Sequence, residues 1–259
     1  MRTNRVKAML KRGEVVLGTF VRTTSPPVVE VLGLSGFDFI IIDNEHSPLG
    51  IESTANQIRT ADLMDIVPIV RVTENRQSLI LRALDAGALG VQVPQISSME
   101  EARLAAESAK YAPLGVRGLA TSHRAAKYGF MDDETYWEAA NQETMVVAYV
   151  ENREAYEELD NILTVPGIDV FMIGPMDLSQ ALGHPTHPEH PEVQQAIEEI
   201  IKKVRGAGRA VGITAATPEA AKGWIEKGVQ YIAYSSDLGL LARISSQSLR
   251  DIHQSLAGE

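Results

Sequence analysis

Eight short runs rich in β-branched and other apolar residues recur along the chain, and segments with helical spacing of apolar residues separate them. Most of these runs are continuously apolar, which is typical of strands buried on both faces. Strands that alternate with helices favour a parallel sheet, and eight of them favour a closed barrel. The expected strands are Val16–Phe20, Asp38–Asp43, Val67–Val72, Leu89–Val93, Met145–Glu151, Asp169–Ile173, Ala210–Thr214 and Gln230–Ser235.

The main alternative architecture is a doubly wound open sheet. Such a sheet would place a glycine-rich, phosphate-binding turn after its first strand, but the residues there are Val21-Arg22-Thr23-Thr24. The length of 259 residues is typical of one barrel, and no linker or internal repeat divides the chain. We therefore expect residues 1–259 to form a single-domain α/β fold, a (β/α)8 TIM barrel. Apolar residues from Leu241 to Leu256 recur at helical spacing and predict an amphipathic terminal helix.

The composition excludes several functions. The chain has no cysteine, so it has no disulfide, no zinc–thiolate site and no cysteine nucleophile. Its formal net charge of −10 would repel phosphate backbones, so we expect no nucleic-acid partner. No apolar run has the ~20 residues of a membrane helix, and no apolar stretch typical of a signal peptide follows the N-terminus, so we expect a cytoplasmic protein without membrane contact. An anionic substrate would need local positive charge, from a metal ion or an arginine.

Charged residues are concentrated where the predicted strands end. In a parallel barrel, functional side chains project from the carboxyl ends of the strands. We therefore expect the polar residues at the ends of the second, third, fifth and sixth strands to meet in one site. These residues are Asp43, His46, Arg71, Glu151 and Asp177.

Glu151 and Asp177 follow adjacent predicted strands. Two carboxylates placed in this way can share one hard cation and leave positions for water and substrate oxygens. The alternative is that each acid only stabilises the N-terminus of a following helix. Their proximity to a histidine and an arginine favours a metal site. No lysine ends a predicted strand, which disfavours a Schiff-base mechanism.

Arg71 ends an otherwise apolar strand, where a guanidinium requires an anionic partner. It is a candidate for stabilising a developing enolate oxygen, and the alternative is a structural ion pair with Asp43 or Glu45. His46 lies three residues beyond Asp43, whose carboxylate could fix the tautomer of the imidazole and raise its basicity. We expect His46 to be a general base, acting directly or through a metal-bound water, rather than a capping residue.

The segment Gly174-Pro175-Met176-Asp177 turns from a strand into a helix. Proline at the first helical position leaves the next amides without helical partners. The N–H groups of Met176 and Asp177 therefore form a candidate cradle for a carboxylate.

Two segments outside the strand ends also invite an interpretation. The connection from Ala112 to Thr144 is unusually long, and at the catalytic face it would be a substrate lid. His184, His187 and His190 alternate with prolines and could suggest zinc. Proline favours an extended chain that points the rings in different directions, so we expect a solvated loop without a catalytic role.

Several motifs occur in order at barrel spacing, and together they make nearly the whole chain resemble the HpcH/HpaI aldolase family. That family includes metal-dependent 4-hydroxy-2-oxoheptanedioate and 2-dehydro-3-deoxyglucarate aldolases, with citrate lyase β-subunits as distant relatives. The motifs are Phe37-Asp38-Phe39, Asp43-Asn44-Glu45-His46, Pro68-Ile69-Val70-Arg71-Val72, Leu84-Asp85-Ala86-Gly87-Ala88, Arg117-Gly118, Tyr149-Val150-Glu151 and Ile173-Gly174-Pro175-Met176-Asp177-Leu178-Ser179.

The resemblance implies a lyase that reversibly cleaves a 4-hydroxy-2-oxo acid to pyruvate and an aldehyde through a metal-stabilised pyruvate enolate. It implies that Glu151 and Asp177 bind Mg²⁺, Mn²⁺ or Co²⁺ and that Arg71 stabilises the enolate. His46, with Asp43 or Asp85, would handle the proton through a water molecule.

The resemblance also implies that the amides of Met176 and Asp177, next to Gly174, hold the pyruvate carboxylate. Asp85 precedes its strand, so a neighbouring subunit would have to supply it to the site. Family members assemble as hexamers of paired barrels that exchange the terminal helix, which implies a homohexamer here.

The sequence departs from the family's pattern at Tyr149-Val150 and Asn44, and the segment Thr121–Arg124 has no counterpart that we can assign. These departures, with the unassigned role of Ser122–Lys127, leave the identity of the aldehyde open. One alternative function is an acyl-CoA lyase of the malyl-CoA or citrate lyase β-subunit type, for which a basic surface would be expected. Another is a barrel that binds a metabolite without converting it, which would lack the base or a metal ligand.

Overall fold

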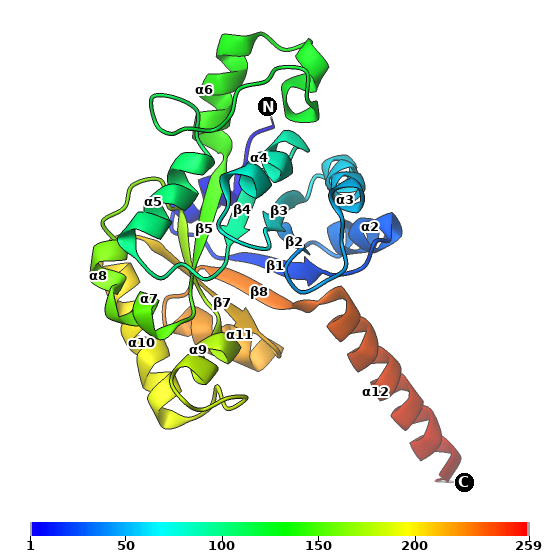
Figure 1. Cartoon of the computed structure of the whole chain (residues 1–259). Coiled ribbons are helices and arrows are strands. Elements are labelled where there is room, and N and C mark those ends of the chain that lie inside the picture. Colours follow the sequence, from blue (N-terminus) through cyan, green and yellow to red (C-terminus); the bar gives the residue numbers. More distant parts are fainter. Residues whose placement is uncertain (1, 258–259) are drawn as a thin grey trace.

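The structure, a computed structural model, describes residues 2–257 and contains a closed barrel of eight parallel strands, paired in sequence order from β1 to β8 (Figure 1). Each end of each strand lies within one residue of the position expected from the sequence, so the predicted (β/α)8 barrel is confirmed. The strands are β1 (Val16–Val21), β2 (Phe39–Asp43), β3 (Val67–Arg71), β4 (Gly90–Val93), β5 (Met145–Val150), β6 (Val170–Ile173), β7 (Ala210–Ala215) and β8 (Tyr231–Ser236).

Helices connect the strands and cover the outside of the barrel (Figure 1). Several begin at the sequence signals expected for them, such as Thr217, whose side chain accepts from the amide of Ala220 ahead of a proline at the first position. The helices are α1 (Arg5–Lys11), α2 (Pro26–Leu34), α3 (Ile51–Leu63), α4 (Gln77–Asp85), α5 (Met99–Ser108), η1 (Arg124–Gly129), α6 (Asp133–Glu143), α7 (Arg153–Glu157), α8 (Leu159–Ile162), α9 (Pro175–Ala181), α10 (Pro191–Gly206), α11 (Pro218–Glu226) and α12 (Asp237–Ala257).

Side chains from alternate strand positions fill the interior of the barrel. The rings of Phe39 and Tyr231 stack there with their centroids 4.2 Å apart. Gly18 of β1 makes room for this pair, because a Cβ at Gly18 would lie 2.2 Å from the Phe39 ring. The barrel is therefore a packed core and not a pore.

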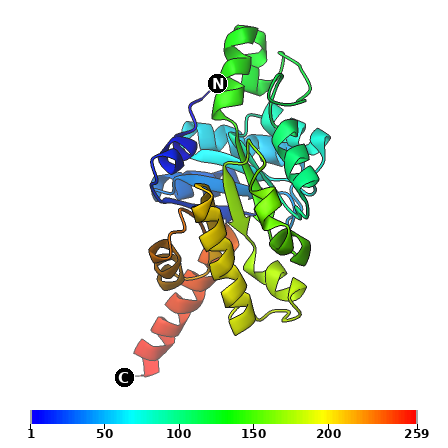
Figure 2. The same ribbon diagram turned by 90° about the vertical axis from the view of Figure 1, so that its left-hand side faces the viewer.

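The last helix, α12, projects away from the barrel (Figures 1 and 2). Its expected apolar stripe is present, but more than half of the surface of each of these side chains is exposed. An apolar cavity of about 790 Å³ lies where α12 leaves the barrel, against Val28 and Val31 of α2. The members of the stripe are Leu241, Ile244, Leu249, Ile252 and Leu256.

The long connection from Ala112 to Thr144 lies at the amino-terminal end of the barrel, so the expectation of a lid on this chain's own catalytic face was wrong. Lys110 Nζ donates to the carbonyl of Thr144, just before β5, at 2.7 Å. Arg117 donates to Asp85, which ends α4 ahead of β4, at 2.8 Å. The reason is topological: α5 runs back along the barrel after β4, so the segment that follows it begins at the opposite end. In both views α6, within this segment, lies far from α12 (Figures 1 and 2).

None of the helices among residues 2–257 combines the length and the apolar character that a membrane span requires.

Candidate active site

The polar residues predicted from the strand ends do meet at the carboxyl-terminal mouth of the barrel. A cavity of about 520 Å³ opens there, within the range of small-molecule sites. It is lined by five of the predicted site residues, namely His46, Arg71, Gly174, Met176 and Asp177.

Glu151 directly follows β5 and is almost completely buried, with 3% of its surface exposed. Its Oε1 accepts a hydrogen bond of 2.9 Å from the backbone amide of Gln95, which follows β4. Its other oxygen lies against Gly174, where an added Cβ would be 2.5 Å from Oε2. Only glycine at position 174 therefore lets this carboxylate occupy the space between β5 and β6.

The electrostatics around Glu151 are those of a carboxylate that lacks a positive partner. The pKa of Glu151 is raised to about 7, chiefly by burial and also by the charges of the nearby Asp177 and Glu45, against the lowering effect of the hydrogen bond from Gln95. The pKa of Glu45 is also raised, first by burial, although Arg71 and His46 oppose this effect. A divalent cation would relieve the repulsion among these acids, so the donor set fits an oxygen-ligated metal ion.

Arg71 and Asp43 form a buried, bidentate ion pair. Nε of Arg71 donates to Oδ1 at 2.9 Å, and a terminal nitrogen donates to Oδ2 at 2.7 Å. The other terminal nitrogen lies 3.1 Å from Glu45 Oε2. Burial alone would raise the pKa of Asp43, but the hydrogen bonds and the charge of Arg71 outweigh it and hold that pKa below its ordinary value. The structural ion pair considered from the sequence therefore exists, and Arg71 lines the cavity as well.

The expected contact between the Asp43 carboxylate and the imidazole of His46 is absent. Oδ1 of Asp43 instead accepts from the backbone amides of Glu45 and His46, each at 3.2 Å. Nε2 of His46 lies 3.7 Å from Glu45 Oε2, and just over half of the His46 side chain is exposed. The reason is that the tight turn after β2 brings these amides to Asp43 and leaves Glu45 as the acid beside the ring.

The helix α9 begins as expected, with Gly174 at the N-cap and Pro175 at the first position. Among the described residues, the backbone amides of Met176 and Asp177 have no hydrogen-bond acceptor. The assignment of a substrate carboxylate to these amides stays a prediction.

Asp85 is the one predicted site residue that lies elsewhere. It ends α4 at the amino-terminal end of the barrel, where it pairs with Arg117 and lies 3.6 Å from Nε2 of His123. A single chain therefore does not bring Asp85 to its own cavity.

The cavity also contains side chains that the sequence reasoning did not single out. Arg22 follows β1, and its Nε donates to Asp43 Oδ2 at 3.0 Å. The same rule that found the other residues, polar side chains at carboxyl ends of strands, applies to Arg22 and would have found it. The remaining polar members of the lining are Tyr149, Thr214, Ser235 and Ser236.

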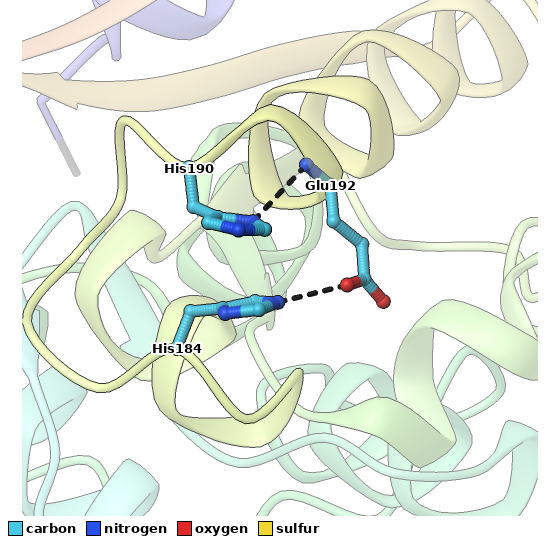
Figure 3. Close-up of side chains that lie close together, drawn as sticks. All are labelled: His184, His190 and Glu192. Atoms are coloured by element: carbon cyan, nitrogen blue, oxygen red, sulfur yellow. Dashed lines mark hydrogen bonds and ion pairs between the residues drawn. The ribbon is translucent and has the colours of Figure 1, made fainter.

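In the histidine-rich loop before α10, the side chains of His184, His190 and Glu192 lie close together (Figure 3). The rings of His184 and His190 stack with centroids 3.5 Å apart, and Nε2 of His184 lies 2.8 Å from Glu192 Oε2. The expectation that the rings point in different directions was therefore wrong, because the prolines lie in successive turns and not in an extended chain. None of these three residues lines the cavity at the barrel mouth.

A closed (β/α)8 barrel with buried acids and a paired arginine around a cavity at the carboxyl ends of its strands defines a TIM-barrel enzyme with a candidate cation site. Residues 17–243 match the HpcH/HpaI aldolase/citrate lyase family, and the chain belongs to that family.

Named relatives place the chain among aldolases. It is 35% identical over 241 residues to a 2-dehydro-3,6-dideoxy-6-sulfogluconate aldolase of Pseudomonas putida, covering 93% of this chain and 94% of that protein. It is 36% identical over 248 residues to a 2-keto-3-deoxy-L-rhamnonate aldolase of Shigella sonnei (strain Ss046), covering 95% and 92%. These findings confirm the expected family and the expected enzyme class, a lyase of the aldolase type.

A solved structure agrees with the fold. The crystal structure of an HpcH/HpaI aldolase/citrate lyase family protein from Burkholderia cenocepacia J2315 superposes with a TM-score of 0.93 at 32% identity. The superposition covers 97% of this chain and 100% of that one.

Proposed function

We propose that this protein is a divalent-cation-dependent aldolase that reversibly cleaves a 4-hydroxy-2-oxo acid to pyruvate and an aldehyde. The observation that carries the proposal is that the ion-paired Arg71 and the acid Asp177 line one cavity, and that the buried Glu151 lies against Gly174 of the same lining. Arg71 would supply hydrogen-bond donors for a developing oxyanion. Glu151 and Asp177 would supply oxygen ligands for a cation.

Glu151 and Asp177 are the residues that would hold the cation, which we propose to be Mg²⁺, Mn²⁺ or Co²⁺. The bound cation would neutralise part of the negative charge that pyruvate carries as its enolate. The fixed position of Glu151, between the amide of Gln95 and the bare backbone of Gly174, prepares the site without rearrangement.

Arg71 would stabilise the remaining charge on the C2 oxygen. A guanidinium has five N–H donors. Asp43 accepts two of them and Glu45 lies beside a third, so two remain for a substrate oxygen. Asp43 thus acts as a positioning residue that holds the plane of the guanidinium.

His46 would move the proton at C3 of pyruvate or at the hydroxyl of the cleaved acid, directly or through water. Its imidazole is at the cavity, exposed, and next to Glu45. Asp85 could assist only from a second subunit, because in its own chain it lies at the opposite end of the barrel. The amides of Met176 and Asp177 would hold the pyruvate carboxylate.

The unfilled apolar surfaces support a homo-oligomer, for which we propose a hexamer. The stripe on α12 and the cavity beside α2 are both apolar, and a second copy of the chain has the same stripe. An exchanged α12 would cover both surfaces at once.

A pyruvate-release assay tests the proposed function. The protein should release pyruvate from 4-hydroxy-2-oxo acids, EDTA should abolish turnover, and Mn²⁺, Co²⁺ or Mg²⁺ should restore it. A pyruvyl-lysine adduct trapped by borohydride would overturn the mechanism. Cleavage only of acyl-CoA substrates would support the acyl-CoA lyase instead, and binding of the acids without turnover would indicate a metabolite-binding barrel.

A further inference from the structure

Arg22 is a second guanidinium at the mouth of the barrel, and the proposed pyruvate chemistry does not use it. Its backbone amide donates to both oxygens of the Asp237 carboxylate, each at 3.1 Å. Its Nε donates to Asp43 at 3.0 Å. Both ends of the residue are therefore anchored, and 37% of the side chain is exposed toward solvent and the cavity.

The terminal nitrogens of Arg22 have no hydrogen-bond partner among residues 2–257. Arginine commonly pairs with a carboxylate through two parallel hydrogen bonds. Asp43 cannot offer Arg22 that geometry, since Arg71 already occupies both of its oxygens. Four N–H donors of a positioned cation are consequently left available at the active-site cavity.

The cavity is chemically divided around the barrel. On one side Asp177, in the first turn of α9, lines the cavity, and Glu151, directly after β5, lies behind Gly174. On the other side the cavity is lined by Thr214 of β7, Ser235 of β8 and Arg22, which directly follows β1. The hydroxyls of Thr214 and Ser235 have no hydrogen-bond partner in the described part of the chain. Ser235 has a left-handed backbone with φ 55°, a strained conformation for a residue other than glycine that is often found at functional sites.

We propose that Arg22, with the hydroxyls of Thr214 and Ser235, binds an anionic group on the aldehyde half of the substrate. This inference rests on the proposed function. It makes the preferred substrate a 4-hydroxy-2-oxo acid with a second acidic group, either a carboxylate or a phosphate, at the end remote from the pyruvyl carbons. A chain with a net charge of −10 repels such a substrate at long range, so recognition requires a local cation of this kind.

The competing explanation is that Arg22 only supports the Asp43–Arg71 pair. Under that explanation, loss of Arg22 would slow the reaction of every aldehyde equally, because the enolate site itself would be disturbed. Under the proposal, the loss depends on the charge of the aldehyde. The two explanations therefore differ in the expected ratio of kcat/KM for charged and neutral aldehydes, and not in whether the reaction slows.

The test measures aldol addition of pyruvate to two matched pairs of aldehydes with the Mn²⁺-loaded full-length protein. The first pair is 4-oxobutanoate and butanal, and the second is glyceraldehyde 3-phosphate and glyceraldehyde. The wild type should prefer the charged member of at least one pair, and which pair responds identifies carboxylate or phosphate. In Arg22→Gln the ratio of kcat/KM, charged to neutral, should fall about tenfold or more, mainly through KM, and Arg22→Lys should restore part of it.

Arg59→Gln, which removes an equal charge from the exposed face of α3, is the control and should leave the ratio unchanged. A parallel loss for charged and neutral aldehydes in Arg22→Gln would overturn the proposal, as would a wild type without preference in either pair. Exchange of the C3 protons of pyruvate in deuterated water is measured first with the wild-type protein. This measurement separates a failure of the proposed function from a failure of the inference about Arg22. Absence of both exchange and addition would overturn the proposed function and this inference together.

Discussion

The backbone amide of Gln95 donates a hydrogen bond of 2.9 Å to Oε1 of Glu151. Gln95 reaches this position with a left-handed backbone, φ 55°, which costs energy in any residue except glycine. A strained turn after β4 therefore orients an acid that follows β5.

The first prediction concerns this turn. Gln95→Val places a β-branched side chain in a left-handed conformation, so the turn should relax and release Glu151. We expect about a tenfold loss of Mn²⁺ affinity by calorimetry. Gln95→Gly is the matched control, because glycine adopts this φ freely, and it should bind Mn²⁺ as the wild type does. Equal affinity in the two variants would show that the amide does not orient Glu151.

The second prediction concerns Gly174. In Gly174→Ala the new Cβ would lie 2.5 Å from Glu151 Oε2, so the carboxylate must move. We expect Mn²⁺ binding to be lost while the circular dichroism spectrum is retained. The control is Gly206→Ala at the end of α10, where an added Cβ meets nothing within 4 Å. Normal Mn²⁺ binding by Gly174→Ala would mean that Glu151 is not a metal ligand.

The third prediction separates charge from geometry at Arg71. Arg71→Ala should slow exchange of the C3 protons of pyruvate about a hundred- to thousandfold, as is typical when one preorganised donor to an oxyanion is removed. Arg71→Lys keeps the charge but cannot pair with Asp43 through two bonds, so it should not restore the rate. Exchange is followed by NMR in deuterated water, and Mn²⁺ affinity is measured alongside. If exchange and Mn²⁺ binding are lost together, Arg71 supports the acids and does not act on the enolate.

The fourth prediction concerns assembly. Ile244, on the exposed apolar stripe of α12, also borders the cavity beside α2. Ile244→Asp would place a charge in the proposed subunit interface and should shift the protein to smaller species in sedimentation velocity. Gln254→Asp adds the same charge outside the stripe and should leave the assembly intact. A full-length protein that sediments as a stable monomer would contradict the oligomer.

The fifth prediction concerns pH. Burial, with help from the charge of Lys7, lowers the pKa of Lys110 to about 7, from an ordinary value of 10.5. Between pH 7 and 10 the unfolded chain then binds more protons than the folded one. The contribution of this group to the free energy of unfolding should therefore rise with pH across this window, by at most about 1.4 kcal/mol per pH unit, and level off below pH 7, where both states are protonated.

Lys110→Met should show a shallower pH dependence in urea unfolding at pH 7, 8 and 9. Lys202→Met, on the exposed side of α10, supplies the comparison and should keep the wild-type slope. An unchanged slope in Lys110→Met would mean that this amine is charged in the folded protein at neutral pH.

The sequence alone determined the architecture, because the information is local and repeated. Strands buried on both faces must be continuously apolar, and helices beside them must be amphipathic, so every strand boundary could be placed within one residue. The same regularity also predicted where the candidate active-site residues lie. Parallel strands end at one rim, and therefore Arg71 and Asp177, more than a hundred residues apart, were expected in one cavity and line it together.

Tertiary structure alone decided which atoms meet, because contacts depend on directions that a pattern of residue types does not contain. In the turn after β2, the Asp43 carboxylate accepts hydrogen bonds from the backbone amide of His46 and from Arg71. Glu45 is therefore the acid that lies beside the imidazole of His46. The path of α5 carries the long connection to the far end of the barrel, and with it Arg117, the partner of Asp85. Where a side chain lies depends on how the chain turns after each strand, and those turns are set by packing among residues distant in the sequence.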